Sequence, residues 1–390
     1  MNNQMKPPRC SGLSHFISSI HSKSLIIIAL LIVLITSFFL VPAISDIISH
    51  PQQQSLPQSI SLLPGQQIWK NGVSSYLFGT NDTQEWVANN VETNLTVQHA
   101  LNNAHFTLLR TFFFDKSLLD DHSTTDAEIE QRLKTVENSG MNCLGILEPV
   151  YDPVFVKHVV AYAGNRCNLY EFGNEPDNSS KLDMQEYIQD WNNLVPQLRK
   201  INPLAKFIGP ALADYTQVRF FLDNVKASGV LPDAISFHWY PCVGSDTASS
   251  CLAKTSTYEQ VTTQVKKWVK NILGQNLPVG ITEWNFNADN PPAPYGKDPV
   301  FIRQFSISAL DSMIQAKLDF ANQFDAASGA GSGGLDMFDF TTGQPKPQYS
   351  AIKGLIDHYI PGSLPSPTPT ASTFLSPELT SVGKSETSRY

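Results

Sequence analysis

Two glutamates follow strand-like segments, at positions where a carboxyl group can act as an acid, a base or a nucleophile. Glu175 lies in the segment YEFGNEPD (residues 170–177), where Pro176 stops a strand because proline has no N–H for the ladder. Glu283 ends a second apolar segment, VGITEWN (residues 279–285). Glycosidic bond cleavage requires two such groups, one to protonate the leaving oxygen and one to attack or to activate water. The rest of the chain must bring them together.

Apolar segments alternate with helical patterns between residues 65 and 360. The predicted strands are 75–80, 106–113, 141–147, 168–174, 206–211, 234–240, 278–284 and 334–340, and helical spacing is clearest at 126–138, 184–201, 258–273 and 300–320. This alternation predicts a parallel sheet, and eight repeats predict an α/β fold closed as a (β/α)8 TIM barrel. Glu175 then ends the fourth strand and Glu283 the seventh, both at the C-terminal rim where barrel active sites are assembled.

The motifs GNEP (173–176) and TEW (282–284) on these strands resemble the retaining glycoside hydrolases of clan A, over residues 65–360. The resemblance implies that Glu175 is the general acid/base, Glu283 the nucleophile and Asn174 a ligand of the sugar 2-hydroxyl group. The charge of Glu283 is expected to help hold the proton on Glu175. The motifs look like the β-xylosidase and β-glucuronidase branches and also like the β-1,3-glucanase branch, and exo and endo action stay open.

Strand alternation places Ser236, His238 and Tyr240 on one face of the sixth strand, which should face the barrel lumen. In the clan, the matching histidine and tyrosine line the catalytic site, so Tyr240 is expected to donate a hydrogen bond to Glu283. Arg110 ends an apolar run on the second strand and is costly to bury unpaired. The resemblance implies that Arg110 binds the nucleophile carboxylate, and Glu171 is the alternative partner.

Aromatic side chains are candidate platforms for a pyranose ring. We predict that Trp284 contacts substrate in this way, whereas Trp239 is equally suited to the core. The clan often has an aromatic residue after the eighth strand, and Phe338 or Phe340 is expected there. Glu148, just past the third strand, is expected either to contact substrate or to be solvated.

The net charge of −8 and the pI near 5.6 argue against a nucleic-acid partner and favour a neutral polar ligand, here an oligosaccharide or polysaccharide bound by a monomer. No Cys/His cluster has the spacing of zinc ligands, so we expect neither a metal nor a cofactor. Cys242 and Cys251 share one polar loop that a disulfide could close. Cys143 and Cys167 fall at the start of apolar strands and are interpreted as small core residues.

Residues 25–44 contain no charge and are long enough to span a bilayer as a helix. Basic residues precede this run and none follows before Lys70, which predicts a cytoplasmic segment 1–24, a transmembrane anchor 25–44 and an outward-facing body. Residues 45–64 are expected to form a linker and 361–390 a disordered Pro/Ser/Thr-rich tail around the domain at 65–360. The alternative is a cleaved signal peptide and a secreted protein.

The combined prediction is a retaining glycoside hydrolase that cleaves β-linked sugars through a covalent glycosyl-enzyme. One alternative is a catalytically silent carbohydrate-binding or wall-tethering module, because a fold does not fix a function. Another is a transglycosidase, in which a sugar instead of water attacks the intermediate.

Overall fold

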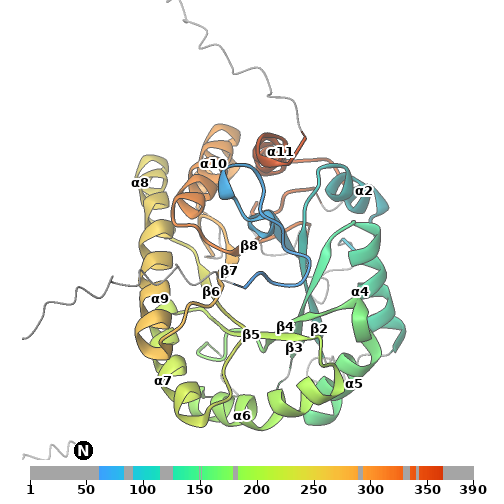
Figure 1. Ribbon diagram of the computed structural model, residues 1–390. Coiled ribbons are helices and arrows are strands. Elements are labelled where there is room, and N and C mark those ends of the chain that lie inside the picture. Colours follow the sequence, from blue (N-terminus) through green and yellow to red (C-terminus); the bar gives the residue numbers. More distant parts are fainter. Residues whose placement is uncertain are drawn as a thin grey trace, which may run out of the picture. The chain divides into compact units, whose positions relative to one another are not determined.

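The computed structural model describes residues 61–82, 91–114, 126–148, 150, 152–178, 183–288, 293–327, 334–339 and 342–362. Eight parallel strands follow one another around a closed barrel, and the last pairs with the first (Figure 1). The strands are β1 Gly79–Asp82, β2 Leu108–Phe114, β3 Asn142–Glu148, β4 Leu169–Phe172, β5 Lys206–Leu212, β6 Ala234–Trp239, β7 Val279–Trp284 and β8 Phe320–Gln323. The predicted (β/α)8 barrel is confirmed.

Helices surround the barrel (Figure 1). The α-helices are α2 Leu95–Asn103, α4 Asp126–Asn138, α5 Pro153–Ala163, α6 Met184–Ile201, α7 Val218–Ser228, α8 Ala248–Ala253, α9 Thr257–Leu273, α10 Pro299–Gln315 and α11 Pro347–Tyr359. Short 3-10 helices are η1 Lys70–Gly72, η2 Ser75–Leu77, η4 Gly164–Arg166, η5 Tyr215–Gln217, η6 Lys254–Ser256 and η7 Pro294–Lys297. Local sequence sets the helix ends: Asp183 and Glu186 form a capping box at the start of α6, and Gly274 ends α9 in a left-handed conformation.

The lower part of the barrel lumen is apolar. Six strands contribute one buried residue each to this layer, namely Leu108, Leu144, Leu169, Ile208, Ala234 and Phe320. Two positions further along β2 and β4, the same lumen face carries Arg110 and Glu171, which are fully buried. The apolar layer therefore closes the barrel beneath a charged layer that leads to the C-terminal rim.

The eighth strand is not where the sequence predicted it. Residues 334–340 were expected to form it, but β8 is Phe320–Gln323, and α10 stops at Gln315 instead of continuing to residue 320. This strand was not predicted because polar Asn322 faces the lumen and the segment lacks the apolar pattern of a buried strand. Asn322 Nδ2 donates to the carbonyl oxygens of Thr80 and Leu108 inside the barrel. The segment 334–339 instead runs beside the chain that leaves β8, where Met337 N donates to Asp325 O. At the other end, the predicted first strand at 75–80 begins as η2 and becomes β1 only at Gly79.

Two disulfides tie neighbouring parts of the barrel. Cys143 and Cys167 are bonded across adjacent strand starts with a Cα–Cα distance of 5.1 Å, so their interpretation as free core residues was wrong. They are 24 positions apart in sequence, and only the pairing of β3 with β4 brings them together. Cys242 and Cys251 are also bonded, as their shared loop suggested.

No helix in the described part of the chain combines the length and apolarity needed to cross a membrane. The predicted anchor at 25–44 lies outside the described residues, as do segments 1–24 and 45–60 and the tail from residue 363 onward.

Candidate active site

Glu175 lies in a tight turn directly after β4. Gly173 and Glu175 both have positive φ angles, 83° and 44°, and at Gly173 the absence of a side chain removes the steric cost. Glu175 N donates to Ala211 O at 3.0 Å, and the Asp177 carboxylate accepts hydrogen bonds from the backbone of Ala213 and Asp214. The turn after β4 is therefore tied to the end of β5, and the Glu175 carboxyl group is held at the rim.

Glu283 lies on β7 and is only 7% exposed. Its Oε1 accepts a hydrogen bond from Arg110 Nη1 at 2.7 Å, and its Oε2 accepts one from Tyr240 Oη at 3.0 Å. Two donors thus hold the carboxylate from different elements, which fixes its orientation.

Arg110 joins the site residues into one network. Besides Glu283, its guanidinium donates to Glu171 at 2.5 Å, to Asn81 Oδ1 at 2.8 Å and to Asn174 Oδ1 at 2.7 Å. The sequence left open whether Arg110 holds Glu171 or Glu283, and in the structure it holds both. A fully buried arginine shared between two carboxylates is compensated, because each buried charge has an opposite partner and hydrogen bonds.

His238 connects the two glutamates. Its Nδ1 donates to Glu175 Oε1 at 2.7 Å and lies 3.6 Å from Glu283 Oε2. Burial works to lower the pKa of His238, but the charge of Glu283 and the hydrogen bond and charge of Glu175 outweigh it and raise the pKa above the ordinary value of 6.5. Arg110, with Nη2 3.3 Å from Nε2, opposes this rise in the pKa.

The pKa of Glu175 differs from the sequence-based expectation. Burial works to raise it, but the hydrogen bond and charge of His238, the Asn178 amide and the Arg110 charge together lower the pKa of Glu175 to about 2. In this arrangement the proton shared by the pair therefore lies on His238, next to Glu175 Oε1. The two groups titrate as one coupled unit.

The two candidate catalytic carboxylates lie close together. One oxygen of Glu175, one oxygen of Glu283 and a ring nitrogen of His238 all lie within 4.8 Å of one another. Retaining glycosidases need a separation of about 5 to 5.5 Å, whereas inverting enzymes need more room for water. These three atoms could also ligate a metal ion, but the adjacent Arg110 charge opposes a cation there.

Comparison with known proteins adds the family. The sequence model of glycosyl hydrolases family 39 matches residues 155–327, which is less than half of the chain but includes both glutamates. This part of the chain is similar to glycosyl hydrolase family 39. This match confirms the resemblance to clan A. No curated protein matched the sequence.

Several solved enzyme structures share the fold at low identity. A family 39 glycoside hydrolase from Bacteroides cellulosilyticus WH2 has 15% identity and a TM-score of 0.53, covering 72% of this chain and 64% of its own. A monomeric β-xylosidase from Caulobacter crescentus CB15 has 14% identity and a TM-score of 0.56, covering 72% and 68%. The GH39 enzyme from Xanthomonas axonopodis pv. citri has 14% identity and a TM-score of 0.57, covering 78% of this chain and 71% of its own. At these identities the likeness establishes the fold.

The aromatic residues beside the candidate site are not those predicted. Trp284 is 1% exposed and meets Tyr258 edge to face, so as placed it has no free face for a sugar. Phe338 is fully buried against Tyr349, and Phe340 lies outside the described residues. The half-buried ring that follows β8 is Phe324, which packs edge to face on Tyr240 at 6.3 Å. Phe324 was not predicted, because the eighth strand was expected at residues 334–340 instead of at Phe320–Gln323.

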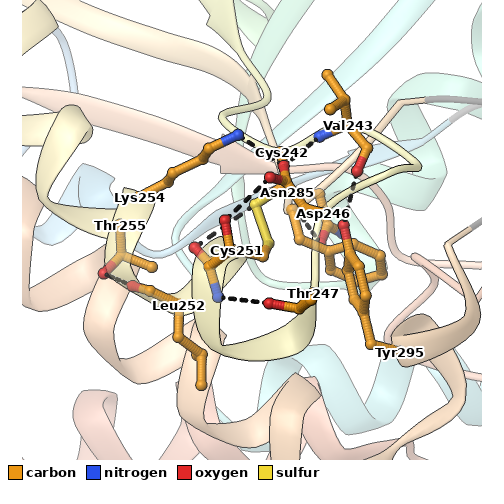
Figure 2. Close-up of a disulfide and its surroundings, with 12 residues drawn as sticks. Cys242, Val243, Asp246, Thr247, Cys251, Leu252, Lys254, Thr255, Asn285 and Tyr295 are labelled. Carbon is orange, nitrogen blue, oxygen red and sulfur yellow. Dashed lines mark hydrogen bonds and ion pairs between the residues drawn. A yellow bond between two sulfur atoms is a disulfide. The ribbon is translucent and has the colours of Figure 1, made fainter.

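The loop after β6 is closed by the disulfide between Cys242 and Cys251 (Figure 2). Cys242 N donates to Phe286 O at 2.9 Å, which ties the ends of β6 and β7 together just past Tyr240 and Glu283. Asp246 accepts hydrogen bonds from Val243 N and from Lys254 Nζ, and the disulfide to Cys251 closes the loop. The tyrosine that orients Glu283 is thus anchored by covalent and polar contacts.

We expect Tyr240→Phe to lower kcat/KM for an aryl β-glycoside by on the order of 10- to 100-fold, because a hydrogen bond to a charged group contributes about 1.5 to 3 kcal/mol. Kinetics would be compared with Tyr162→Phe, which removes the same atom from the outer face of α5. A loss of less than twofold at Tyr240, or an equal loss at both positions, would contradict its role in orienting Glu283.

Proposed function

We propose that this chain is a retaining glycoside hydrolase that cleaves β-linked sugars in the way that β-xylosidases do. The observation that carries the proposal is the approach of Glu175 and Glu283 to within 4.8 Å at the rim of the barrel, with Glu283 held by Arg110 and Tyr240. The match with family 39 and the fold shared with β-xylosidases support the same reading.

In the first step, a Glu283 oxygen attacks the anomeric carbon and the bond to the leaving oxygen breaks. Arg110 and Tyr240 keep the attacking carboxylate oriented. His238 Nδ1 passes its proton to Glu175 through the 2.7 Å hydrogen bond. Glu175 then gives this proton to the leaving oxygen. Substrate that covers Glu175 removes water from it, and this favours the neutral carboxylic acid at the moment it is needed.

In the second step, Glu175 is a carboxylate again after its proton has left with the aglycone. It takes a proton from water, whose oxygen attacks the anomeric carbon and releases Glu283. The proton then returns to His238 Nδ1 through the same hydrogen bond, which restores the starting state. Asn174 is held on its carboxamide oxygen by Arg110, which leaves the amide N–H groups free to donate to a sugar hydroxyl group. Two displacements at one carbon return the original β configuration.

The test is hydrolysis of a panel of aryl β-glycosides and of β-glucan, xylan and mannan oligosaccharides by the purified full chain, with the anomer of the first product followed by proton NMR. We expect one sugar class to release the β-anomer first. An α-anomer would overturn the retaining mechanism. Tight binding without turnover would favour the non-catalytic module, and lengthened oligosaccharides would favour a transglycosidase.

We also propose that the barrel acts outside the cytoplasm, tethered by residues 25–44 or released after their cleavage. Two disulfides in the described part of the chain support an oxidising compartment. Fractionation of cells followed by N-terminal sequencing of the mature protein would separate the anchored form from the secreted form.

A further inference from the structure

Glu148 is a carboxyl group of the site that the proposed mechanism does not use. It is the last residue of β3 and follows Leu144 by four positions, so it shares the lumen face with that core residue. Its Oε2 accepts a hydrogen bond from the backbone N–H of Asn174 at 2.9 Å. Glu148 therefore lies beside the turn that carries Glu175, above the apolar floor of the barrel.

The second oxygen of Glu148 is not engaged in the same way. Among the described residues Oε1 has no hydrogen-bond partner. It is also not fully enclosed by protein atoms. The residue is half-buried, whereas Arg110 and Glu171 are fully buried. An accessible acceptor on the lumen face is suited to a ligand hydroxyl group.

Within the described ranges, no cation is paired with Glu148 alone. The described groups that face it are Arg110 from β2, Tyr187 from α6 and the turn at Asn174 after β4. Arg110 is already paired with Glu171 and Glu283. Burial raises the pKa of Glu148 to about 7, although the Asn174 hydrogen bond and the Arg110 charge work to lower it. Above that pH the lumen therefore gains a further negative charge.

We propose that Glu148 is a substrate-binding residue that accepts a sugar hydroxyl group through Oε1, and that its carboxylate charge selects neutral sugars over uronic acids. The inference rests on the proposed function, because it assumes that the sugar sits on Glu175 and Glu283. A uronate carboxylate in the same lumen would meet Glu148 as well as these two glutamates, with Arg110 already neutralised. Repulsion between like charges in a partly desolvated site is strong enough to discriminate ligands.

The test uses ligands that resist hydrolysis, so that binding is measured even without turnover. Calorimetry would give the affinities of 4-nitrophenyl 1-thio-β-xyloside, 1-thio-β-glucoside and 1-thio-β-glucuronide for the full chain at pH 8 and pH 5.5. At pH 8 we expect the wild type to bind its preferred neutral sugar at least about tenfold more tightly than the uronide. At pH 5.5, where Glu148 is protonated, this ratio should fall.

Two substitutions separate charge from hydrogen bonding. Glu148→Gln keeps an acceptor for Asn174 N and removes the charge. At pH 8 the preference for the neutral sugar over the uronide should therefore fall by about tenfold. The part of the pH dependence of this preference that is due to Glu148 should vanish. Glu148→Ala should also weaken binding of the neutral sugar, by roughly 2- to 10-fold. Asp223→Asn on the outer face of α7 removes the same charge far from the lumen and should keep the wild-type ratio at both pH values.

Equal ratios in Glu148→Gln and the wild type, preference of the wild type for the uronide, or no binding of any probe would overturn the inference. The pH series on the wild type needs no variant, so the inference can still fail if Glu148→Gln does not fold. If the binding ratios are as expected but no glycoside is hydrolysed, the proposed catalytic function fails and the selection by Glu148 stands.

Discussion

Glu283→Gln should lose hydrolytic activity by on the order of 10⁴-fold or more while the barrel stays folded. The amide has nearly the shape of the carboxylate but neither its charge nor its nucleophilicity, so the covalent intermediate cannot form. Arg110 keeps Glu171 as a charged partner, so the substitution does not leave an uncompensated buried charge. Steady-state kinetics with an aryl β-glycoside and circular dichroism would measure the two effects separately.

Trapping the intermediate gives a second readout for the same position. An activated 2-fluoro glycoside should add one sugar mass to the wild-type peptide that contains Glu283 and nothing to the variant. The matched control is Glu137→Gln on the exposed face of α4, which should keep both turnover and labelling. Full activity in Glu283→Gln, or labelling of a different residue, would reject Glu283 as the nucleophile.

The positions of both glutamates could be predicted from the sequence because each lies at or just after the C-terminal end of an apolar strand. Strand alternation also placed His238 and Tyr240 on one face, and the structure brings both to the glutamates. These inferences needed only local information, namely a period of two and a proline that stops a strand. The residues at the ends of β4, β6 and β7 could therefore be predicted without knowing their contacts.

The features that the sequence missed depend on contacts between distant segments. Polar Asn322 on β8 is satisfied only by carbonyl groups of β1 and β2, so its segment does not resemble a buried strand on its own. Asn81 gave no signal as a partner of Arg110 because its role depends on a hydrogen bond across the barrel. The low pKa of Glu175 similarly depends on the direction of one ring nitrogen of His238.

Glu175→Ala should lower kcat/KM for glycosides with poor leaving groups by on the order of 10²- to 10⁴-fold, because the proton donor is lost. Aryl glycosides with activated leaving groups need little protonation, so they should still form the intermediate and then release it slowly. Added azide needs no base and fits the space left by the carboxylate. It should restore turnover and give a β-glycosyl azide, detected by NMR.

The pH profile follows from the coupled pair. The wild type needs the proton that His238 shares with Glu175, and the pKa of His238 is raised, so activity should persist up to a pH above 6.5 and fall as that proton leaves. In Glu175→Ala with an activated substrate, this alkaline limb should disappear because no proton transfer to the leaving group remains.

Asp177→Asn is the control that separates loss of proton transfer by Glu175 from displacement of the turn that carries it. Asp177 holds the turn of Glu175 through the backbone of Ala213 and Asp214 but does not contact the catalytic groups. Its loss should lower activity through misplacement of Glu175, without rescue by azide and without loss of the alkaline limb. If azide rescued both variants, or neither, the general acid/base would have to be sought elsewhere on the rim. Rescue of Glu175→Ala alone would assign proton transfer to the Glu175 carboxyl group itself, because azide can replace a missing base but cannot repair a displaced turn.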